Sequence, residues 1–373
     1  MKKTFAQTFI TDLLKAVGIE VNGSHPWDIQ VHHEGFFPAV LHHRNLGLGE
    51  AYMNHWWDCE RVDLFFERCI RGNIHHKISA DWLLTLKIIL YLMINRQTKK
   101  RALKVGKKHY DLGNELFTAM LDKRMNYTCG YWKNATTLDA AQLAKLELVC
   151  QKLMLKPGMR LLDIGCGFGA LAKHAAEHHG VDVVGITISK NQLEYAQKNC
   201  AGLPIELRFQ DYRDINESFD RIASLGMFEH VGSKNHETYM QVAHRCLKDD
   251  GLFLLHTIGN NESELHTDPW IEKYIFPNGL IPSIAQIGKS IENLFVMEDW
   301  HNFGADYDKT LMVWHTHFNA HWHEIQHHYS DQFFRMWNYY LTSCAGVFRA
   351  RYLQLWQIVL SKNGVAGGYQ APR

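Results

Sequence analysis

A glycine-rich turn between an apolar strand pattern and a helical pattern constrains this chain more than any other feature. Residues Met159 to Leu171 read MRLLDIGCGFGAL, an apolar run, an acid and then three glycines. Such a turn needs positive φ, which glycine adopts without strain, and a missing Cβ lets a ligand approach the backbone. The N–H groups at the helix start would face that ligand. We therefore expect a strand, a tight turn and a helix N-terminus that form a binding site.

The loop by itself leaves the ligand open. Gly165, Gly167 and Ala170 satisfy a loose GxGxxG/A dinucleotide fingerprint. Asp163, however, would repel a pyrophosphate, and its carboxylate is suited to the ammonium group of a methionine moiety. The next strand pattern ends in Thr187 and not in the ribose-binding acid of a NAD site, although many S-adenosylmethionine (SAM) enzymes also have such an acid. The loop favours SAM, with NAD and a ligand-free turn as alternatives.

Composition narrows the class of protein. The 373 residues suffice for one large domain or two, and the net charge of +1 gives no support to a nucleic-acid partner. Eight cysteines without a CxxC pair indicate reduced thiols in the cytoplasm. Polar residues interrupt the apolar run at the N-terminus, which predicts an amphipathic helix and not a signal peptide.

Residues 1–94 are predicted to form a small N-terminal domain. The pattern indicates a helix that ends near Gly18, a strand at Trp27 to His33, a turn and helix over Gly47 to Arg71, and an apolar helix at Trp82 to Ile94. Four aromatic residues are expected in its core and not at a membrane: Phe36, Phe37, Trp56 and Trp57.

Residues 95–108 form a basic stretch that we interpret as a linker. It contains seven lysines or arginines and no acid. The stretch is either a solvated charge run or a surface attracted to anionic lipid headgroups, where each basic residue contributes about 1 kcal/mol. No recognition motif for nucleic acid accompanies the charge, so we expect no such partner.

Residues 109–373 alternate between strand and helix patterns, which predicts an α/β domain with an open, mainly parallel sheet and helices on both faces. Two insertions, Asn260 to Ser290 and Asp306 to Arg351, are expected to cover a substrate site. The last strand pattern is similar to the antiparallel strand that closes the sheets of SAM-dependent methyltransferases. The predicted strands are Met159–Cys166, Val181–Ile188, Ile205–Asp211, Phe219–Met227, Leu252–Gly259, Phe295–Trp300 and Leu353–Lys362.

Reactive side chains follow several of these strands. Ligands of open α/β sheets bind beyond the carboxyl ends of the strands, where Glu229, His256 and Tyr307 are predicted to lie. The segment Tyr127 to Trp132, which contains Cys129, is a candidate lid over the cofactor. These groups could orient a small oxyanion or act as a base. The alternatives are a helix cap for Glu229, a core histidine for His256 and ordinary packing for Tyr307.

A histidine-rich stretch contains a formal match to the zincin motif, HEIQH at 323–327. No glutamate follows Glu324, so a usual third ligand is missing. We therefore expect a solvated helix face there and predict no metal site.

Eight motifs together resemble the cyclopropane-fatty-acyl-phospholipid synthases, over nearly the whole chain from residue 109 onward. Phe168 stands where a tryptophan is common in that family. Residues 1–94 are similar, with weaker motifs, to the smaller domain of the bacterial members that act on phospholipids. The motifs are HYDLGNELF (109–117), YTCGYW (127–132), LLDIGCGFG (161–169), GMFEHVG (226–232), LLHTIG (254–259), DPWIEKYIFPNG (268–279), EDWHNFGADYDKTL (298–311) and FRARYLQLWQIV (348–359).

The resemblance implies transfer of a methylene group from SAM to the cis double bond of an unsaturated phospholipid acyl chain. In this family the alkene attacks the sulfonium methyl group, and the resulting carbocation loses a methyl proton as the ring closes, with a bound bicarbonate ion as base. The bicarbonate ligands carried over by motif are Cys129, Glu229, His256, Tyr307 and the backbone at Ile258.

The resemblance also implies the cofactor contacts and the partners. The enzyme is expected to be a homodimer, peripheral on the cytoplasmic face of the membrane, with the phospholipid surface as its partner. Two alternatives remain: a SAM-dependent lipid methyltransferase that gives methyl-branched or hydroxylated chains, and a non-catalytic lipid-binding module. Cofactor contacts are expected from Tyr127, Thr128, Asp163, Gly165, Cys166, Gly167, Thr187, Gln192, Asp211 and Tyr212.

Overall fold

The computed structural model describes residues 4–74 and 113–373, which divide into two compact units. Unit 1 contains residues 4–74, 266–277 and 307–353. Unit 2 contains residues 113–265, 278–306 and 354–373. The predicted linker 95–108 and the predicted helix Trp82 to Ile94 lie outside the described residues.

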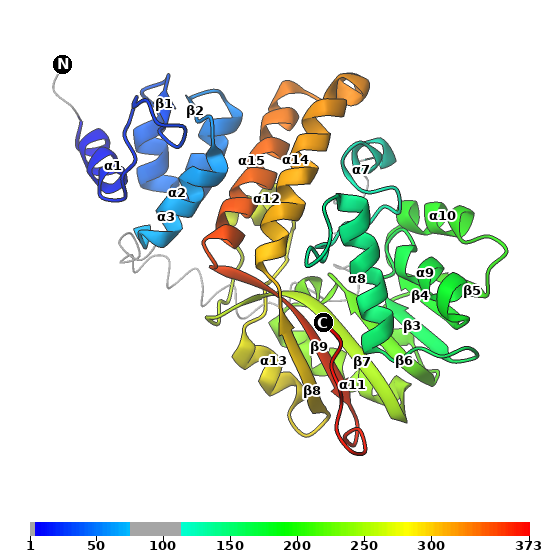
Figure 1. Ribbon diagram of the computed structural model, residues 1–373. Coiled ribbons are helices and arrows are strands. Elements are labelled where there is room, and N and C mark those ends of the chain that lie inside the picture. The colour runs from blue at the N-terminus through cyan, green and yellow to red at the C-terminus, as the bar shows by residue number, and fades with distance from the viewer. Residues whose placement is uncertain (1–3, 75–112) are drawn as a thin grey trace. The chain divides into compact units, whose positions relative to one another are not determined.

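A seven-stranded sheet forms the centre of unit 2 (Figure 1), in the order β5-β4-β3-β6-β7-β9-β8. Strands β5, β4, β3, β6 and β7 pair in parallel, and β8 pairs with β9 in antiparallel orientation. The predicted mixed α/β sheet of the SAM-dependent methyltransferase type, closed by an antiparallel last strand, is therefore confirmed. The strands are β3 (Arg160–Ile164), β4 (Asp182–Thr187), β5 (Ile205–Phe209), β6 (Phe219–Leu225), β7 (Leu247–Asn260), β8 (Val296–Asn302) and β9 (Leu353–Ser361).

Strand β7 is longer than the sequence pattern predicts. It begins at Leu247 and not at Leu252, because the exposed polar residues between these positions join the strand through a register irregularity opposite β6. At its other end β7 extends to Asn260, whose N–H donates a hydrogen bond to the carbonyl of Pro282 at 2.9 Å. His256 and Ile258 therefore lie within the strand.

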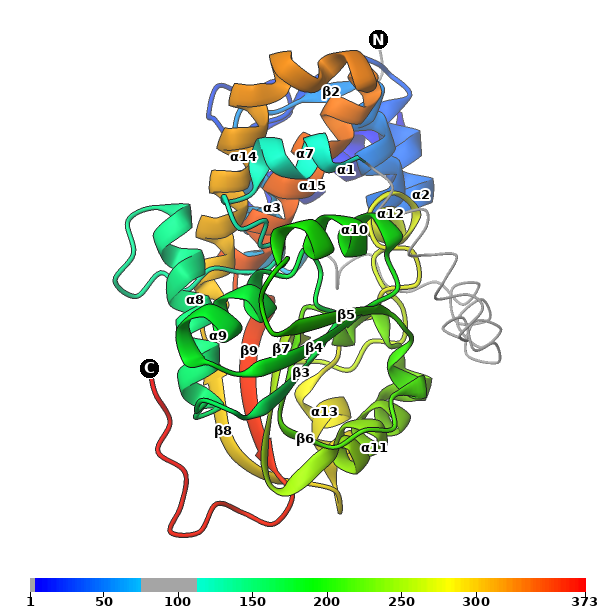
Figure 2. The same cartoon turned by 90° about the vertical axis from the view of Figure 1, so that its right-hand side faces the viewer.

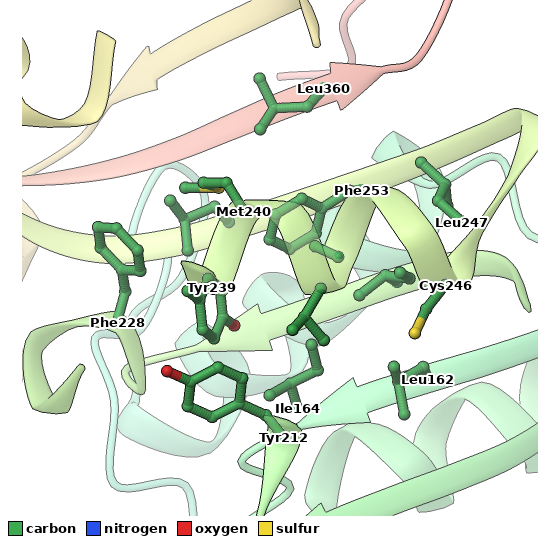
Figure 3. Close-up of a cluster of buried hydrophobic side chains, with 14 of the residues drawn as sticks. Leu162, Ile164, Tyr212, Phe228, Tyr239, Met240, Cys246, Leu247, Phe253 and Leu360 are labelled. Carbon is green, nitrogen blue, oxygen red and sulfur yellow. The ribbon is translucent and has the colours of Figure 1, made fainter. Parts of the chain in front are cut away.

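Successive strand residues point to opposite faces of the sheet, so two separate cores form. Leu161 packs with side chains of α8 and α9 on one face, whereas Leu162 packs with α11 and α13 on the other. Figure 2 shows these two helical layers with the sheet between them. Figure 3 shows the second core, in which Met240 of α11 and Phe253 of β7 lie among the buried side chains. The helical elements of unit 2 are α7 (Asn114–Met120), α8 (Leu138–Lys152), α9 (Ala170–His179), α10 (Lys190–Asn199), η1 (Tyr212–Asp214), η2 (Phe228–His230), η3 (Ser233–Asn235), α11 (His236–Cys246) and α13 (Ile284–Ile291).

Unit 1 joins the N-terminal residues with two segments from much later in the chain. Trp57, which is fully buried, contacts Phe65 of α3 and Tyr339 of α15 at ring-centroid distances of 5.4 and 6.5 Å. This aromatic packing explains why residues 307–353 belong here, whereas the sequence pattern groups them with the catalytic domain. The elements are α1 (Phe5–Lys15), β1 (Gln30–Val31), α2 (Phe36–Met53), β2 (Trp57–Asp58), α3 (Val62–Arg71), α12 (Pro269–Tyr274), α14 (Ala305–Ile325, whose first two residues belong to unit 2), η4 (Gln326–His328) and α15 (Asp331–Arg349).

The structure of the N-terminal residues differs from the prediction in three places. The strand expected at Trp27 to His33 is only Gln30–Val31, and β2 at Trp57–Asp58 interrupts the helix expected over Gly47 to Arg71. The structure starts helix α2 at Phe36 and not at Gly47, with a break in helical geometry at Arg44 (φ 50°). Gly47 lies inside this bent helix, where a Cβ would meet the carbonyl oxygen of Ala39 at 2.2 Å. Position 47 therefore requires glycine because the backbone of Ala39 packs closely against it, and not because the chain turns there. The aromatic residues expected in the core are buried at 36, 37 and 57 and half-buried at 56.

A buried ion-pair group links the early and late parts of unit 1. Asp63 is 1% exposed and accepts hydrogen bonds from the guanidinium groups of Arg61 and Arg349. Arg349 also pairs with Asp308 at 2.7 Å. These guanidinium groups lower the pKa of Asp63 against the effect of its burial. In the described part of the chain, no helix is long and apolar enough to cross a membrane.

Candidate active site

The glycine loop after β3 adopts the backbone that its composition predicts. Gly165, Gly167 and Gly169 have φ values of 81°, 54° and 83°. A Cβ at Gly165 would lie 2.9 Å from the side chain of Met227, so both the dihedral angle and the space require glycine. Gly169 is the N-cap of α9, which leaves the first N–H groups of that helix near the loop.

A cavity lies against this loop, at the carboxyl ends of β3, β4 and β6. Thr187 at the end of β4 uses its hydroxyl to accept a hydrogen bond from the N–H of Ser189, which shapes the turn into α10. Asp211 is held by two hydrogen bonds of 2.7 Å from the guanidinium group of Arg213. The structure brings all ten predicted cofactor residues to the wall of this one cavity: Tyr127, Thr128, Asp163, Gly165, Cys166, Gly167, Thr187, Gln192, Asp211 and Tyr212.

Aromatic rings form one side of the cavity region. Tyr127 contacts Phe117, which contacts Phe168, and Phe168 contacts Tyr195, with ring centroids 5.2 to 5.6 Å apart. Phe168 is 3% exposed, so it fills its place in this series. The rings fix the loop around Tyr127 against the glycine loop.

Asp163 is a buried acid at the cavity wall. It is 2% exposed, and its Oδ2 atom has no hydrogen-bond partner among residues 4–74 and 113–373. Burial raises the pKa of this carboxyl to about 7, and the charge of Lys145 opposes that rise. A ligand cation at this wall would favour the ionised carboxylate further.

Lys145 on α8 is a cavity residue that the sequence analysis missed. Its side chain is 1% exposed, and its Nζ donates hydrogen bonds to Asn126 Oδ1 at 2.9 Å and to Thr128 Oγ1 at 3.0 Å. Burial lowers the pKa of Lys145 to about 8, against the opposing charges of Asp122, Cys129 and Asp163. Lys145 thus ties the predicted lid segment to the cavity wall.

Two further polar residues support the same segment. Gln142 Nε2 donates to the carbonyl of Thr128 at 2.7 Å, and the N–H of Asn126 donates to Asp122 Oδ1 at 2.7 Å. A sequence signal for this network exists in α8. The buried stripe Leu138, Ala141, Lys145, Leu148, Lys152 follows the helical 3–4 spacing, and two of its positions are lysines.

A second group of buried polar atoms lies at the carboxyl end of β7. Glu229 Oε1 accepts a hydrogen bond of 2.6 Å from the N–H of Ile258, and its carbonyl accepts one of 2.7 Å from Leu280. Glu229 Oε2 is buried and has no partner in the described parts of the chain. Burial raises the pKa of Glu229 to about 7, partly offset by hydrogen bonds from Ile258 and Thr257. The alternative considered for Glu229, a cap of the following helix, is not what the structure shows.

His256 is the neighbouring group on the same strand. Its Nδ1 is 3.3 Å from Gln357 Nε2 of β9, and its Nε2 is buried without a partner in the described residues. Burial places its pKa well below the usual range, so the ring is neutral. In the arrangement in which the Gln357 amide donates to Nδ1, the ring carries its proton on Nε2 and can donate it to a ligand. Gln357 was not among the predicted site residues.

The remaining predicted catalytic residues have different surroundings. Cys129 is fully buried, and its thiol donates to the carbonyl of Gly130 at 3.2 Å. Tyr307 belongs to unit 1, where its ring contacts Phe348 at 4.6 Å. Cys129, Glu229, His256 and Ile258 do not line the cofactor cavity, although Met227 and His230 on either side of Glu229 do.

The zincin-like stretch is exposed to solvent. His323, Glu324 and His327 are exposed, as expected for a solvated face. Helix α14 ends at Ile325, so the two histidines of the motif do not belong to one continuous α-helix.

Comparison with known proteins decides the family. The model of the mycolic acid cyclopropane synthetase family matches residues 97–358. The chain belongs to this family. The cyclopropane-fatty-acyl-phospholipid synthase of Escherichia coli (strain K12) is 55% identical over 362 residues, which cover 97% of this chain and 94% of that relative. Cyclopropane mycolic acid synthase 1 of Mycobacterium tuberculosis (strain H37Rv) is 35% identical over 274 residues, 68% of this chain and 95% of the relative.

Solved structures agree with this cyclopropane synthase family. Mycolic acid cyclopropane synthase CmaA1, complexed with SAH and CTAB, is 34% identical with a TM-score of 0.66, over 70% of this chain and 98% of that chain. Coclaurine N-methyltransferase, at 22% identity and a TM-score of 0.70 over 84% of this chain and 99% of that chain, shares the fold alone. The chain is thus an enzyme of the SAM-dependent methyltransferase fold. The two alternatives for the glycine loop, an NAD site and a turn without a ligand, are therefore rejected.

Proposed function

We propose that this enzyme transfers a methylene group from SAM to the cis double bond of an unsaturated phospholipid acyl chain and so forms a cyclopropane ring. The observation that carries the proposal is 55% identity, over 97% of the chain, to a cyclopropane-fatty-acyl-phospholipid synthase. The cavity beside the glycine loop and the buried polar group of Glu229 and His256 support it.

The cavity residues are proposed to bind and orient SAM, which supplies an electrophilic methyl group. Asp163 is suited to the ammonium group, because a buried carboxylate whose Oδ2 has no hydrogen-bond partner in the described residues is stabilised by a cation. Lys145 and Gln142 hold the segment that presents Tyr127 and Thr128 to the cavity. An unactivated alkene is a weak nucleophile, so this fixed geometry and exclusion of water must supply much of the rate.

The buried polar group is proposed to hold bicarbonate. Glu229 Oε2 and His256 Nε2 are buried polar atoms without partners in the described residues, and such atoms are rarely left unpaired. A neutral His256 with its proton on Nε2 donates to an anion, and a Glu229 with a pKa of about 7 can share a proton with it. Bicarbonate would supply a weak base for the proton lost as the ring closes.

Other residues complete the proposed anion site. The N–H of Ile258 donates to Glu229, so it orients this carboxyl as well as contributing the predicted backbone contact. Cys129 and Tyr307 are proposed ligands on the family motif. A held anion suits this chemistry, because a free side-chain carboxylate closer to the reacting carbon could alkylate itself.

The test is mass spectrometry of phospholipids after incubation of the purified protein with SAM and vesicles of unsaturated phospholipid. A mass gain of one CH₂ group that fragmentation assigns to a ring supports the proposal. A methyl-branched or hydroxylated chain would contradict the proposal and identify the enzyme as another SAM-dependent lipid methyltransferase. If no SAM is consumed, the protein would instead be a non-catalytic lipid-binding module.

We also propose that the enzyme acts peripherally at the cytoplasmic face of the membrane as a homodimer. The basic segment 95–108, which lies outside the described residues, supports attraction to anionic lipid. Light scattering of the purified protein tests the dimer, and flotation with anionic vesicles tests membrane binding.

A further inference from the structure

A group of metal-ligating side chains lies between α8 and α9, outside both the cavity and the Glu229 group. Cys150 comes from α8, and His174 and His179 come from α9. One potential ligand atom of each lies within 4.8 Å of the other two. Glu147, one turn before Cys150, accepts hydrogen bonds at one carboxylate oxygen from His174 Nε2 at 3.1 Å and from His179 Nε2 at 3.2 Å.

The burial of this group is graded. Cys150 is fully buried, and the side chains of His174 and His179 are 6% and 18% exposed. The Glu147 side chain is 39% exposed and forms the rim. The group thus runs from the solvent-exposed Glu147 to the buried sulfur of Cys150. The surrounding buried side chains, such as Val149 and Ala175, are apolar.

The donor set is typical of zinc. A cysteine sulfur, two imidazole nitrogens and a carboxylate oxygen are ligands that Zn²⁺ takes in tetrahedral sites. Ligand atoms about 2.0 to 2.3 Å from such an ion lie roughly 3 to 4 Å from one another. The two imidazole–carboxylate distances already fall in that range, and the ligand atoms of Cys150, His174 and His179 lie within 4.8 Å of one another.

We propose that Cys150, His174 and His179, with Glu147 as the fourth ligand, bind one zinc ion. On binding, the sulfur–hydrogen bond of Cys150 is exchanged for a sulfur–zinc bond, and the proton leaves to solvent. Each imidazole binds as a neutral ring through Nε2, in the tautomer whose proton is on Nδ1, so the two hydrogen bonds to Glu147 are given up when the ion binds. With four protein ligands the coordination shell is closed, so the ion is structural.

The position of the site gives the ion a role in the architecture of unit 2. Helix α8 carries Lys145 and Leu146 to the cofactor cavity, and α9 begins at the end of the glycine loop. The zinc ion would therefore join the two helices that frame the cavity. The four ligands are spread over residues 147–179 without a metal-binding spacing, which is why the sequence pattern predicts no metal here.

The experiment uses the full chain, treated with a chelator and then titrated with Co²⁺ as a spectroscopic substitute for Zn²⁺. We expect one equivalent of Co²⁺ with strong visible bands of tetrahedral geometry and a near-ultraviolet thiolate-to-cobalt band. Zinc should displace the cobalt, remain at one equivalent after desalting and raise the unfolding temperature. Cys150→Ser should lose the thiolate band, and Glu147→Gln should weaken zinc binding about tenfold or more.

The matched control is the double variant His323→Ala, His327→Ala, which removes two exposed histidines of the zincin-like stretch and should retain the full spectrum. If Cys150→Ser fails to fold, His179→Asn at the end of α9 replaces it, because His179 is more exposed. Octahedral cobalt without a thiolate band, or zinc binding that survives Cys150→Ser and His179→Asn, would overturn the proposal and leave an ion-pair group only.

Discussion

Two regions of unit 2 each contain a buried acid whose pKa burial raises to about 7, Asp163 at the cofactor cavity and Glu229 at the end of β7. Their neighbours differ. The charge of Lys145 acts on Asp163, whereas Glu229 accepts a hydrogen bond from the uncharged N–H of Ile258, two residues after the neutral His256 in the same strand. The two acids are both buried, but their neighbours differ. We therefore expect Asp163 to balance the charge of a bound ligand and Glu229 to share a proton.

The largest effect should separate the two acids by function. Glu229→Gln keeps the side-chain shape but removes the proton-sharing carboxyl, so we expect turnover to fall about a thousandfold. SAM affinity should change less than about twofold, since Glu229 does not line the cavity. Product formation and calorimetric titration with SAM measure the two quantities. Parallel loss of turnover and affinity would mean that Glu229 is structural.

The next comparison uses two lysines of one helix. Lys145 and Lys152 both lie buried on α8, and burial lowers the pKa of each to about 8. Lys145→Met should lower the free energy of unfolding by about 3 kcal/mol, because it leaves the buried Asn126 Oδ1 without its donor. Lys152→Met should lower it by less, because Asp299 keeps its ion pair with Arg373. Urea unfolding measures this loss.

Only the first substitution should affect the cofactor. Lys145 bonds to Asn126 and Thr128 of the cavity wall, whereas Lys152 pairs with Asp299 at 3.1 Å and lies outside the cavity. We expect SAM affinity to fall about tenfold in Lys145→Met and to remain normal in Lys152→Met. Equal affinities in the two variants would show that the network around Lys145 does not position the SAM site.

The pH dependence of the free energy of unfolding should show that ionisation of the buried Glu229 destabilises the folded state. Its folded-state pKa of about 7 lies above the unfolded value near 4.3, so the folded state binds more protons between these values. The stability from this proton is present at low pH and is lost as pH rises through 7. Glu229→Gln should therefore gain up to about 3 kcal/mol relative to the unmodified enzyme between pH 5 and pH 8 in urea unfolding. A constant difference across this range would contradict the raised pKa.

The pH dependence of SAM binding should depend on the other acid. If the ammonium group binds beside ionised Asp163, SAM affinity should increase with increasing pH. The increase should be up to about tenfold per pH unit below pH 7, and the affinity should be constant above pH 7. Asp163→Asn should bind SAM weakly and without this slope, while Glu229→Gln should retain it. Titrations between pH 5.5 and 7 make the measurement, and a slope that persists in Asp163→Asn would assign it to another group.

The smallest effect concerns salt. Both acids are buried and therefore weakly screened, so SAM affinity should change less than about twofold between 50 and 200 mM salt. Activity on anionic vesicles should fall several-fold over the same range, because the basic segment 95–108 would lose its attraction to the surface. Activity on neutral vesicles is the control. Salt-independent activity on both would exclude electrostatic docking.

Local rules were enough to predict the sheet and the glycine loop. Alternating apolar residues and positive-φ glycines act over a few positions, and all seven strands were located, including the antiparallel last strand. Lys145 and Gln357 were missed because their importance comes from contacts with distant segments, Thr128 on the one hand and His256 on the other. The grouping of residues 307–353 with the N-terminal residues was missed for the same reason.

The Asp63–Arg349 ion pair has a consequence for the order in which the protein is made. The two residues are 286 positions apart, so a ribosome that adds 5 to 20 residues per second needs roughly fifteen to sixty seconds between them. Until Arg349 and Tyr339 emerge, Asp63 of the nascent segment has only Arg61 as its ion-pair partner, and Trp57 lacks its contact with Tyr339. Unit 1 is therefore begun first but cannot be completed until residue 353 has been made, so a chain that stops before Tyr339 leaves the aromatic side chains of the N-terminal segment without their partner.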